Sequence, residues 1–274
     1  MSDFFQRWKQ FLNENKQTPW KARFGYIVGD FEGNVCAEEN ADQLFYGASM
    51  NKPLIALANL ILFKDTEKRL TEKELRGLLA YSGKYESNNI NRILSRRLPR
   101  KSSKNYAELS KRKKTIGFIT PKMAIEFLSK YGLSKEMLMT YGGPSRNKQS
   151  ARSFFDFLKF LHNASRIKGI EKEVNIIIDY MKRVGLSGKD REFRKIRGLQ
   201  DQLNRRGVLV NSIYGKGGAT NQSGGMKTLN YGFVINNKVI LVIYSSYNNT
   251  KYTSRQNRTH LINKIAQVLK PCLV

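Results

Sequence analysis

Hydrophobic residues recur every three or four positions along much of the chain, which is the spacing of one face of a helix. One of these segments begins with Thr71 followed three residues later by Glu74, the pattern of a capping box. The predicted helices cover residues 3–16, 71–80, 121–131, 150–163, 171–183 and 254–269. The pattern therefore predicts a helical middle and a helix at each end of the chain.

Short apolar runs bounded by turn residues lie nearer the two ends and predict strands. Residues 24–30 form one such run, and a second, shorter run surrounds Val35. Two further runs flank Asn236-Asn237, which is typical of a tight hairpin turn. The strands thus come from both ends of the chain, and the helical segments lie between them.

This order of elements predicts an α/β fold of the α+β type. We expect residues 1–48 and 207–274 to form one antiparallel sheet subdomain flanked by the terminal helices. Residues 49–206 are expected to form a helical subdomain, so that the chain makes one composite domain. No run of about 18 apolar residues occurs, so the sequence predicts no membrane span.

The composition adds a strong positive charge to this picture. Lys and Arg number 49 against 22 Asp and Glu, a formal net charge of +27, and residues 96–114 and 182–206 are especially basic. An acidic partner or surface is therefore expected. Without a helix-turn-helix, zinc-finger or RNP motif, a nucleic acid would be held only through its phosphates.

Two cysteines and two histidines favour neither a disulfide framework nor a zinc site, so no metal or cofactor is predicted.

Ser49-Met50-Asn51-Lys52 is a Ser-x-x-Lys at the start of the apolar residues 49–63. Three positions apart on a helix, the two side chains lie on one face, so the lysine amine can take the serine proton. The spacing occurs three more times in polar surroundings, but only Ser49 opens an apolar helix whose amino end stabilises negative charge. Two interpretations stay open: an activated nucleophile, or a capping serine beside a solvated lysine.

Two other stretches carry candidate chemistry. Ser82 follows a predicted helix, where its hydroxyl suits a proton relay between Lys52 and a leaving group; a polar loop with a capping serine is the alternative. Lys216 precedes two glycines in a predicted edge strand. Small residues there let a substrate backbone approach, and a lysine holds a carboxylate or phosphate. A flexible glycine turn is the alternative.

Taken in this order, the three motifs resemble those of the serine β-lactamase and penicillin-binding-protein (DD-peptidase) superfamily, S-x-x-K, S-D-N and K-T-G. The class A β-lactamase branch is the most similar, and residues 25–52 and 178–191 resemble its flanking segments at low similarity. The resemblance implies catalytic roles for Ser49, Lys52, Ser82 and Lys216. It implies substrate contacts for Lys84, Asn88, Gly217, Gly218, Ala219 and Thr220.

The resemblance also implies an oxyanion hole made by the backbone N–H groups of Ser49 and Ala219. A lysine acts as a base only when neutral, so the pKa of Lys52 must fall through burial and through neighbouring cations. Lys216 and Lys84 are the cations expected to face it.

The second motif departs from the family pattern. Ser82-Gly83-Lys84 stands where S-D-N is expected, so a lysine replaces the asparagine amide. An alternative register, Ser87-Asn88-Asn89, fits the three letters better but its flanking residues worse.

The third motif and the deacylating glutamate depart as well. Gly217 replaces the threonine of K-T-G, and Thr220 supplies a hydroxyl in its place only if the strand bends. No E-x-x-L-N motif occurs. Glu136 lies in the corresponding interval, but we expect it to be a surface glutamate. Acylation is therefore better supported than fast turnover, which argues against an efficient β-lactamase.

Two hypotheses about function remain. The first is a β-lactamase-like serine hydrolase or transpeptidase that acts through an acyl-enzyme on a peptide, amide or ester, with cell-wall peptidoglycan as the candidate polymer. The second is a catalytically impaired binding or structural module of the same fold, of a phage type, that uses its basic surface on an acidic partner.

The first residues lack the layout of a signal peptide, so cytoplasmic residence is expected, with a phage particle or release on lysis as the alternative. The oligomeric state is left open.

Overall fold

The computed structural model describes residues 23–67, 69–80, 121–137, 139–140, 148–182, 200–201, 204–205, 210–221, 226–248 and 265. The predicted helices at 3–16 and 254–269 lie outside this part, apart from Ile265, which is helical and buried. Ser82, Lys84, Asn88 and most of both basic stretches lie outside it too.

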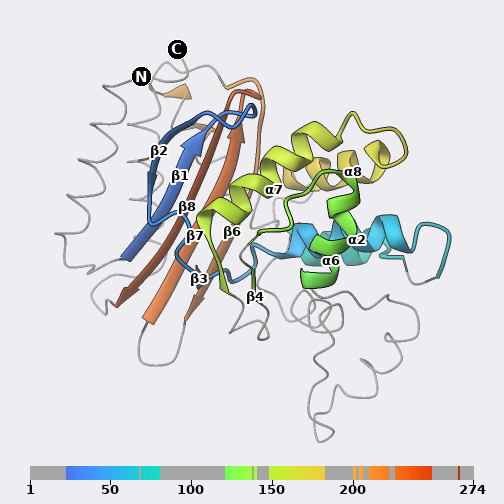
Figure 1. Ribbon diagram of the computed structural model, residues 1–274, viewed down its shortest axis with the longest axis horizontal. Helices are drawn as coiled ribbons and strands as arrows, with labels where there is room; N and C mark the ends of the chain where they lie inside the picture. Colours follow the sequence, from blue (N-terminus) through green and yellow to red (C-terminus); the bar gives the residue numbers. More distant parts are fainter. Residues whose placement is uncertain are drawn as a thin grey trace, which may run out of the picture.

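The main sheet has five strands in the order β2-β1-β8-β7-β6, and every neighbouring pair is antiparallel. The strands are β1 (Arg23–Gly29), β2 (Val35–Glu39), β6 (Ile213–Asn221), β7 (Met226–Ile235) and β8 (Val239–Asn248). Strands from the two halves of the chain meet in the pairing of β1 with β8, seen where the blue and red arrows run together in Figure 1. The predicted α/β fold with an antiparallel sheet is confirmed.

The turns that join β1 to β2 and β7 to β8 each have a local chemical cause. After β1, the side chain of Asp30 accepts hydrogen bonds from the backbone N–H groups of Gly33 and Asn34, each at 2.9 Å, which closes the loop to β2. Between β7 and β8, Asn236 and Asn237 have φ angles of 52° and 50°. Asparagine tolerates this left-handed region better than most residues, and two such residues in succession match the twist of a hairpin.

The described helices lie over one face of this sheet (Figure 1). Their bounds are α2 (Lys52–Leu62), α3 (Glu72–Leu75), α6 (Pro121–Leu128), α7 (Ala151–Ala164) and α8 (Glu171–Lys182). A π-helical turn, η1 (Arg76–Ala80), follows α3, and a 3₁₀ turn, η2 (Ser129–Tyr131), follows α6. Helix α7 packs directly on the sheet, because the ring of Phe154 fills the space where a Cβ on Gly232 would stand.

The capping box is formed as predicted, but the helix that follows it changes its geometry. Thr71 and Glu74 exchange side-chain and backbone hydrogen bonds at the start of α3. From Arg76 the chain forms a π turn in place of the expected α-helix. A π turn holds more residues than an α turn, so it rotates the residues that follow. Leu78 and Leu79 are buried there, at 0% and 1% exposed.

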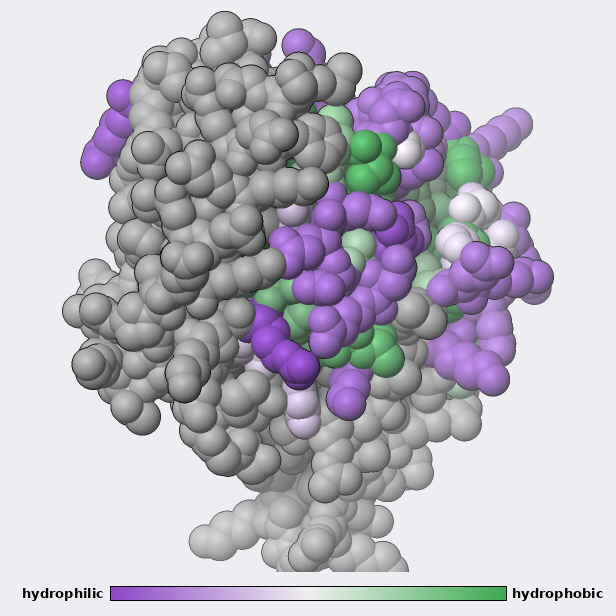
Figure 2. Space-filling view, turned by 60° about the vertical axis from the view of Figure 1, so that its left-hand side comes forward, coloured by the Kyte–Doolittle hydropathy of each residue, from purple (hydrophilic) through white to green (hydrophobic). Residues whose placement is uncertain are grey.

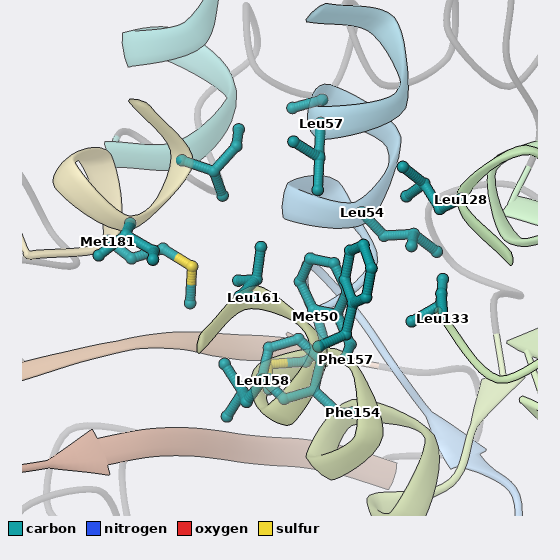
Figure 3. Packing of buried hydrophobic residues seen from close by; sticks show 14 of the residues in the cluster. Met50, Leu54, Leu57, Leu128, Leu133, Phe154, Phe157, Leu158, Leu161 and Met181 are labelled. Atoms are coloured by element: carbon teal, nitrogen blue, oxygen red, sulfur yellow. The ribbon is translucent and has the colours of Figure 1, made fainter. Parts of the chain in front are cut away.

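The core lies among the helices and against the sheet. Met50, just before α2, and Leu54 and Leu57 of α2 belong to one buried cluster with Phe154 and Phe157 of α7 (Figure 3). Leu128, Leu133, Leu158, Leu161 and Met181 complete the labelled part of this cluster. The start of α2 is therefore held by buried apolar contacts, and truncating one such leucine to alanine typically costs about 2–5 kcal/mol.

A second, three-stranded sheet has the order β3-β5-β4, with β3 at Phe45–Tyr46, β4 at Met139–Thr140 and β5 at Lys148–Gln149. The hydrophobic pattern did not predict it, because a strand of two residues has no detectable period. The ring of Phe45 packs where Gly25 of β1 has no side chain; a Cβ on Gly25 would lie 2.5 Å from it. This contact anchors β3 to the main sheet.

Polar residues dominate the described surface on the face shown in Figure 2. The large exposed hydrophobic residues of the described part are Val35, Leu44 and Leu62, at 40%, 39% and 41%. Among the described residues, no helix has both the length and the apolar character needed to cross a membrane.

We predict that His162 makes stability pH-dependent. Its ring stacks on Phe31 at 3.7 Å between centroids, and burial, followed by the charge of Arg166, lowers its pKa from the ordinary 6.5. Below that ordinary value the unfolded chain binds a proton that the native state does not, so stability falls with falling pH. Thermal unfolding of wild type and His162→Phe, from about pH 8 to about pH 5.5, should show a smaller decline in the variant. Equal declines would contradict this role.

Candidate active site

Ser49 lies in a tight turn that joins β3 to α2. The N–H of Met50 donates to the carbonyl of Gly47 at 3.0 Å, and Ala48 has a φ of 48°, a region that residues with a side chain rarely adopt. Ala48 and Met50 are buried at 7% and 0% exposed, whereas Ser49 is partly exposed. The turn thus presents the serine between two buried neighbours, and the strained backbone persists because its surroundings hold it.

Ser49 does not itself belong to the helix that the sequence predicted it to open. α2 begins at Lys52, followed by Pro53. Pro53 has no N–H to donate to the Ser49 carbonyl, so this oxygen accepts instead from the N–H of Lys52, at 3.4 Å. Side chains at the two ends of such an i to i+3 turn lie on the same side. The turn, rather than the helix, is therefore the element expected to bring the Ser49 and Lys52 side chains together.

Lys52 and Lys216 are both deeply buried, each with 1% of its surface exposed. Lysine is rarely buried to this extent, and removal from water disfavours the charged form of an amine. The Lys216 amine donates a hydrogen bond to the Gly217 carbonyl at 3.1 Å. A lysine that acts as a base needs burial and neighbouring cations, and Lys52 meets the first of these two conditions.

Strand β6 lies directly against the Ser49 turn. A Cβ added to Gly218 would stand 2.9 Å from the Gly47 oxygen, 3.1 Å from the Ala48 Cβ and 3.1 Å from the Ser49 nitrogen. No side chain fits in that space, so glycine is required for this approach. The fold therefore brings the first motif together with the third. Since side chains alternate along a strand, Lys216 lies on the same face of β6 as Gly218.

The pairing of β6 with β7 is continuous from Ile213 to Asn221. Thr220 pairs in regular register with Thr228, so this strand lacks the bend that would move Thr220 into the place of the hydroxyl missing at Gly217. Strand β6 also forms one edge of the sheet, which leaves one side of its backbone unpaired by the described strands. An edge of this kind can pair with an extended peptide-like ligand.

The other predicted site residues divide into two groups. Ser82, Lys84 and Asn88 lie outside the described residues, so their roles stay predictions. Glu136 is exposed in the loop after η2, and its backbone N–H donates to the Ser134 hydroxyl at 3.3 Å. It therefore lies on the surface, as the sequence predicted.

Two buried asparagines near the motifs were missed by the sequence reasoning. Asn51 is 1% exposed, and its amide nitrogen and oxygen have no hydrogen-bond partner in the described part of the chain. Asn230 is 0% exposed and donates to the carbonyl of Tyr46 at 2.6 Å. A polar amide inside the apolar run of β7 was the signal that could have identified Asn230, because buried amides are normally hydrogen-bonded.

Neither a protein-family model nor a curated protein sequence matches the chain. Solved structures do. The TLA-3 extended-spectrum β-lactamase aligns with a TM-score of 0.58 and 16% identity over 98% of this chain and 99% of that one. A β-lactamase from Chitinophaga pinensis aligns with a TM-score of 0.56 and 16% identity over 96% and 98%. The TLA-1 extended-spectrum β-lactamase aligns with a TM-score of 0.56 and 14% identity over 97% and 99%. This chain has the β-lactamase fold.

The similarity extends along nearly the whole chain, so the β-lactamase fold includes both the sheet and the helices. The predicted resemblance to the serine β-lactamase and penicillin-binding-protein superfamily is confirmed at the level of the fold. Identities of 14–16% show the fold alone, so the chemistry must be argued from the residues of this chain.

We predict that Gly218→Ala impairs the site more than the fold. The added methyl group must displace β6 from the Gly47 carbonyl, and a shift of about 1 Å at a reacting centre can cost about 100-fold in rate. Labelling of Ser49 by an acylating probe measures this effect. Gly29→Ala is the matched control, because its methyl group strains β1 against the Asn34 carbonyl and the Phe155 ring, not β6 against the Ser49 turn. Equal losses in both variants would contradict the prediction.

Proposed function

We propose that this protein is a serine acyl-transfer enzyme, in which Ser49 forms an acyl-enzyme with a peptide, amide or ester substrate. The observation that carries the proposal is the contact of Gly218 with the backbone of Ser49. This contact places the partly exposed Ser49, just before the deeply buried Lys52, against the Gly-rich edge strand that contains Lys216. A purely structural serine would require neither the buried lysine nor the close approach of the strand.

In the proposed reaction, neutral Lys52 takes the proton of the Ser49 hydroxyl while its oxygen attacks the substrate carbonyl carbon. The carbonyl electrons move to the oxygen, which accepts hydrogen bonds from the backbone N–H groups of Ser49 and Ala219. When the tetrahedral intermediate collapses, the bond to the leaving group breaks and Ser82 relays the proton to that group. Water or an amine then takes the acyl group from Ser49.

The proposed substrate lies along β6, the edge strand of the described sheet. Lys216 holds a carboxylate of the substrate by charge-assisted hydrogen bonding. Lys84, Asn88, Gly217, Gly218, Ala219 and Thr220 are the residues proposed to contact it. A peptide in extended conformation suits such an edge, and cell-wall peptidoglycan is the candidate polymer. The basic stretches 96–114 and 182–206 are proposed to contact the same acidic polymer.

The site lies between the two proposed subdomains, since Ser49 begins the helical part, residues 49–206, and Gly218 belongs to the sheet part, residues 1–48 and 207–274. A substrate bound there would contact both. This division of the chain, and its cytoplasmic or particle-associated location, are parts of the proposal.

A second candidate function is a binding module of the same fold with impaired catalysis. The exposure of Glu136 favours it, because a glutamate in solvent does not position a water molecule against an acyl-enzyme. The absence of a hydroxyl at Gly217 favours it as well. Such a protein would bind its acidic partner through its basic surface and would turn over substrate slowly or not at all.

We predict that a fluorescent penicillin or a fluorophosphonate labels the protein at Ser49. Intact mass should increase by one probe adduct in wild type and stay unchanged in Ser49→Ala. Ser165→Ala is the matched control, since Ser165 starts another Ser-x-x-Lys but donates its hydroxyl to the His162 carbonyl, and it should label normally. If no acylating probe of either class labels wild type, Ser49 is not an activated nucleophile and the binding module is favoured.

We also predict that Glu136 takes no part in deacylation. The label on wild type should be lost slowly, and Glu136→Gln should leave the rate of loss unchanged within about two-fold, because an exposed carboxylate has no fixed water to activate. The adduct is followed by intact mass over hours. Glu126→Gln, which removes another exposed carboxylate, is the control. A marked slowing confined to Glu136→Gln would show that the loop moves Glu136 into the site.

A further inference from the structure

The side chain of Asn230 replaces part of the ladder between β7 and β8. Regular pairs occur at Thr228 with Ser246 and at Tyr231 with Ile243, and the two positions between them, Leu229 and Asn230, form no regular backbone pair with β8. There the backbone N–H of Ser245 donates to Asn230 Oδ1 at 3.2 Å. The amide of Asn230 is thus inserted where a strand-to-strand hydrogen bond would otherwise lie.

The other end of the same amide reaches the chain that leads to Ser49. Asn230 Nδ2 donates to the carbonyl oxygen of Tyr46 at 2.6 Å, and Tyr46 is the last residue of β3, three positions before Ser49. One fully buried side chain therefore links β7, β8 and β3. Its hydrogen bonds lie out of water, where a lost partner leaves an unsatisfied polar group.

Asn230 also lies directly opposite Gly218 in the β6–β7 pair. Residues paired in this way have their side chains on the same face of the sheet. On that face Gly218 leaves room for Gly47, Ala48 and the Ser49 nitrogen, while Asn230 holds the carbonyl of Tyr46. The pair therefore fixes the turn by two contacts, a close approach at Gly218 and a hydrogen bond at Asn230.

The chemistry of the site requires an amide. Oδ1 must accept from an N–H and Nδ2 must donate to a carbonyl, so a single orientation satisfies both. Leucine has nearly the same shape but forms neither bond. Alanine forms neither bond and also leaves a cavity. The two variants thus separate the loss of the hydrogen bonds from the loss of side-chain volume.

We propose that Asn230 is a positioning residue for Ser49: its hydrogen bond to Tyr46 sets the distance between the Ser49 backbone N–H and strand β6. The inference rests on the proposed function, in which that N–H stabilises the oxyanion. Asn230 touches neither substrate nor reacting atoms in this scheme. It acts through the Tyr46–Ser49 segment, and its loss lets that segment move away from Gly218.

The experiment measures acylation of Ser49 by a fluorophosphonate over a range of probe concentrations, separating the rate constant at saturation from the half-saturating concentration. Asn230→Leu and Asn230→Ala should both lower the rate constant by about 10- to 100-fold and change the half-saturating concentration little. Asn59→Ala is the matched control: Asn59 is also 0% exposed and accepts from the Leu70 N–H at 2.8 Å, but it lies near the far end of α2. It should lose thermal stability while keeping the acylation rate constant.

A double variant tests whether Asn230 and Gly218 act on the same turn. If they do, Gly218→Ala combined with Asn230→Ala should lower the rate constant by less than the product of the two single effects. Effects that multiply, or an Asn230→Ala rate constant equal to that of Asn59→Ala, would overturn the proposal and leave Asn230 a structural residue.

Amide hydrogen exchange separates a failure of this inference from a failure of the proposed function. If wild type takes no label at all, acylation at Ser49 is refuted, but the hydrogen bond to Tyr46 is still tested. Asn230→Ala should then speed exchange in peptides that contain residues 45–52 more than Asn59→Ala does. Unchanged exchange in those peptides would show that Asn230 does not hold the turn.

Discussion

The close approach of two backbones at Gly218 is the constraint on which the rest of the site depends. The Ser49 turn and strand β6 come from opposite halves of the chain, and they touch where neither has a large side chain. A serine nucleophile needs hydrogen-bond donors on the far side of its substrate carbonyl. In the proposed mechanism, backbone N–H groups close to the serine are these donors. This approach therefore explains why the strand carries a glycine two positions after its buried lysine.

Around this contact, the core determines how far the site can move. Met50 and Leu54 attach the start of α2 to the rings of α7, and Phe154 of α7 packs against Gly232 of β7. Sheet, α7 and α2 thus form one packed unit. Because packed interiors yield little to small displacements, a shift at β6 is transmitted to Ser49. The two deeply buried lysines belong to this rigid unit, which keeps their amines out of water.

Periodicity and turn chemistry predicted most of the described fold. The Thr71–Glu74 capping box, the Asn236-Asn237 turn and the helices of the middle region all arise from interactions between residues close in sequence, so a local pattern reveals them. The two-residue strands of the small sheet and the π turn at Arg76 have no such pattern. Pro53 in the first turn of α2 is a local start signal, but the apolar pattern of residues 49–63 obscured it.

The sequence by itself determined which residue types the chain offers: a serine and lysine three positions apart, a lysine before two glycines, and an excess of positive charge. These are properties of short segments, and their order along the chain was enough to indicate the fold. Only the tertiary structure decided which of them meet, and at what distance. Gly218 touches Ser49, Asn230 reaches Tyr46, and Glu136 stays in solvent, because long-range strand pairing and core packing, rather than local preference, set those positions.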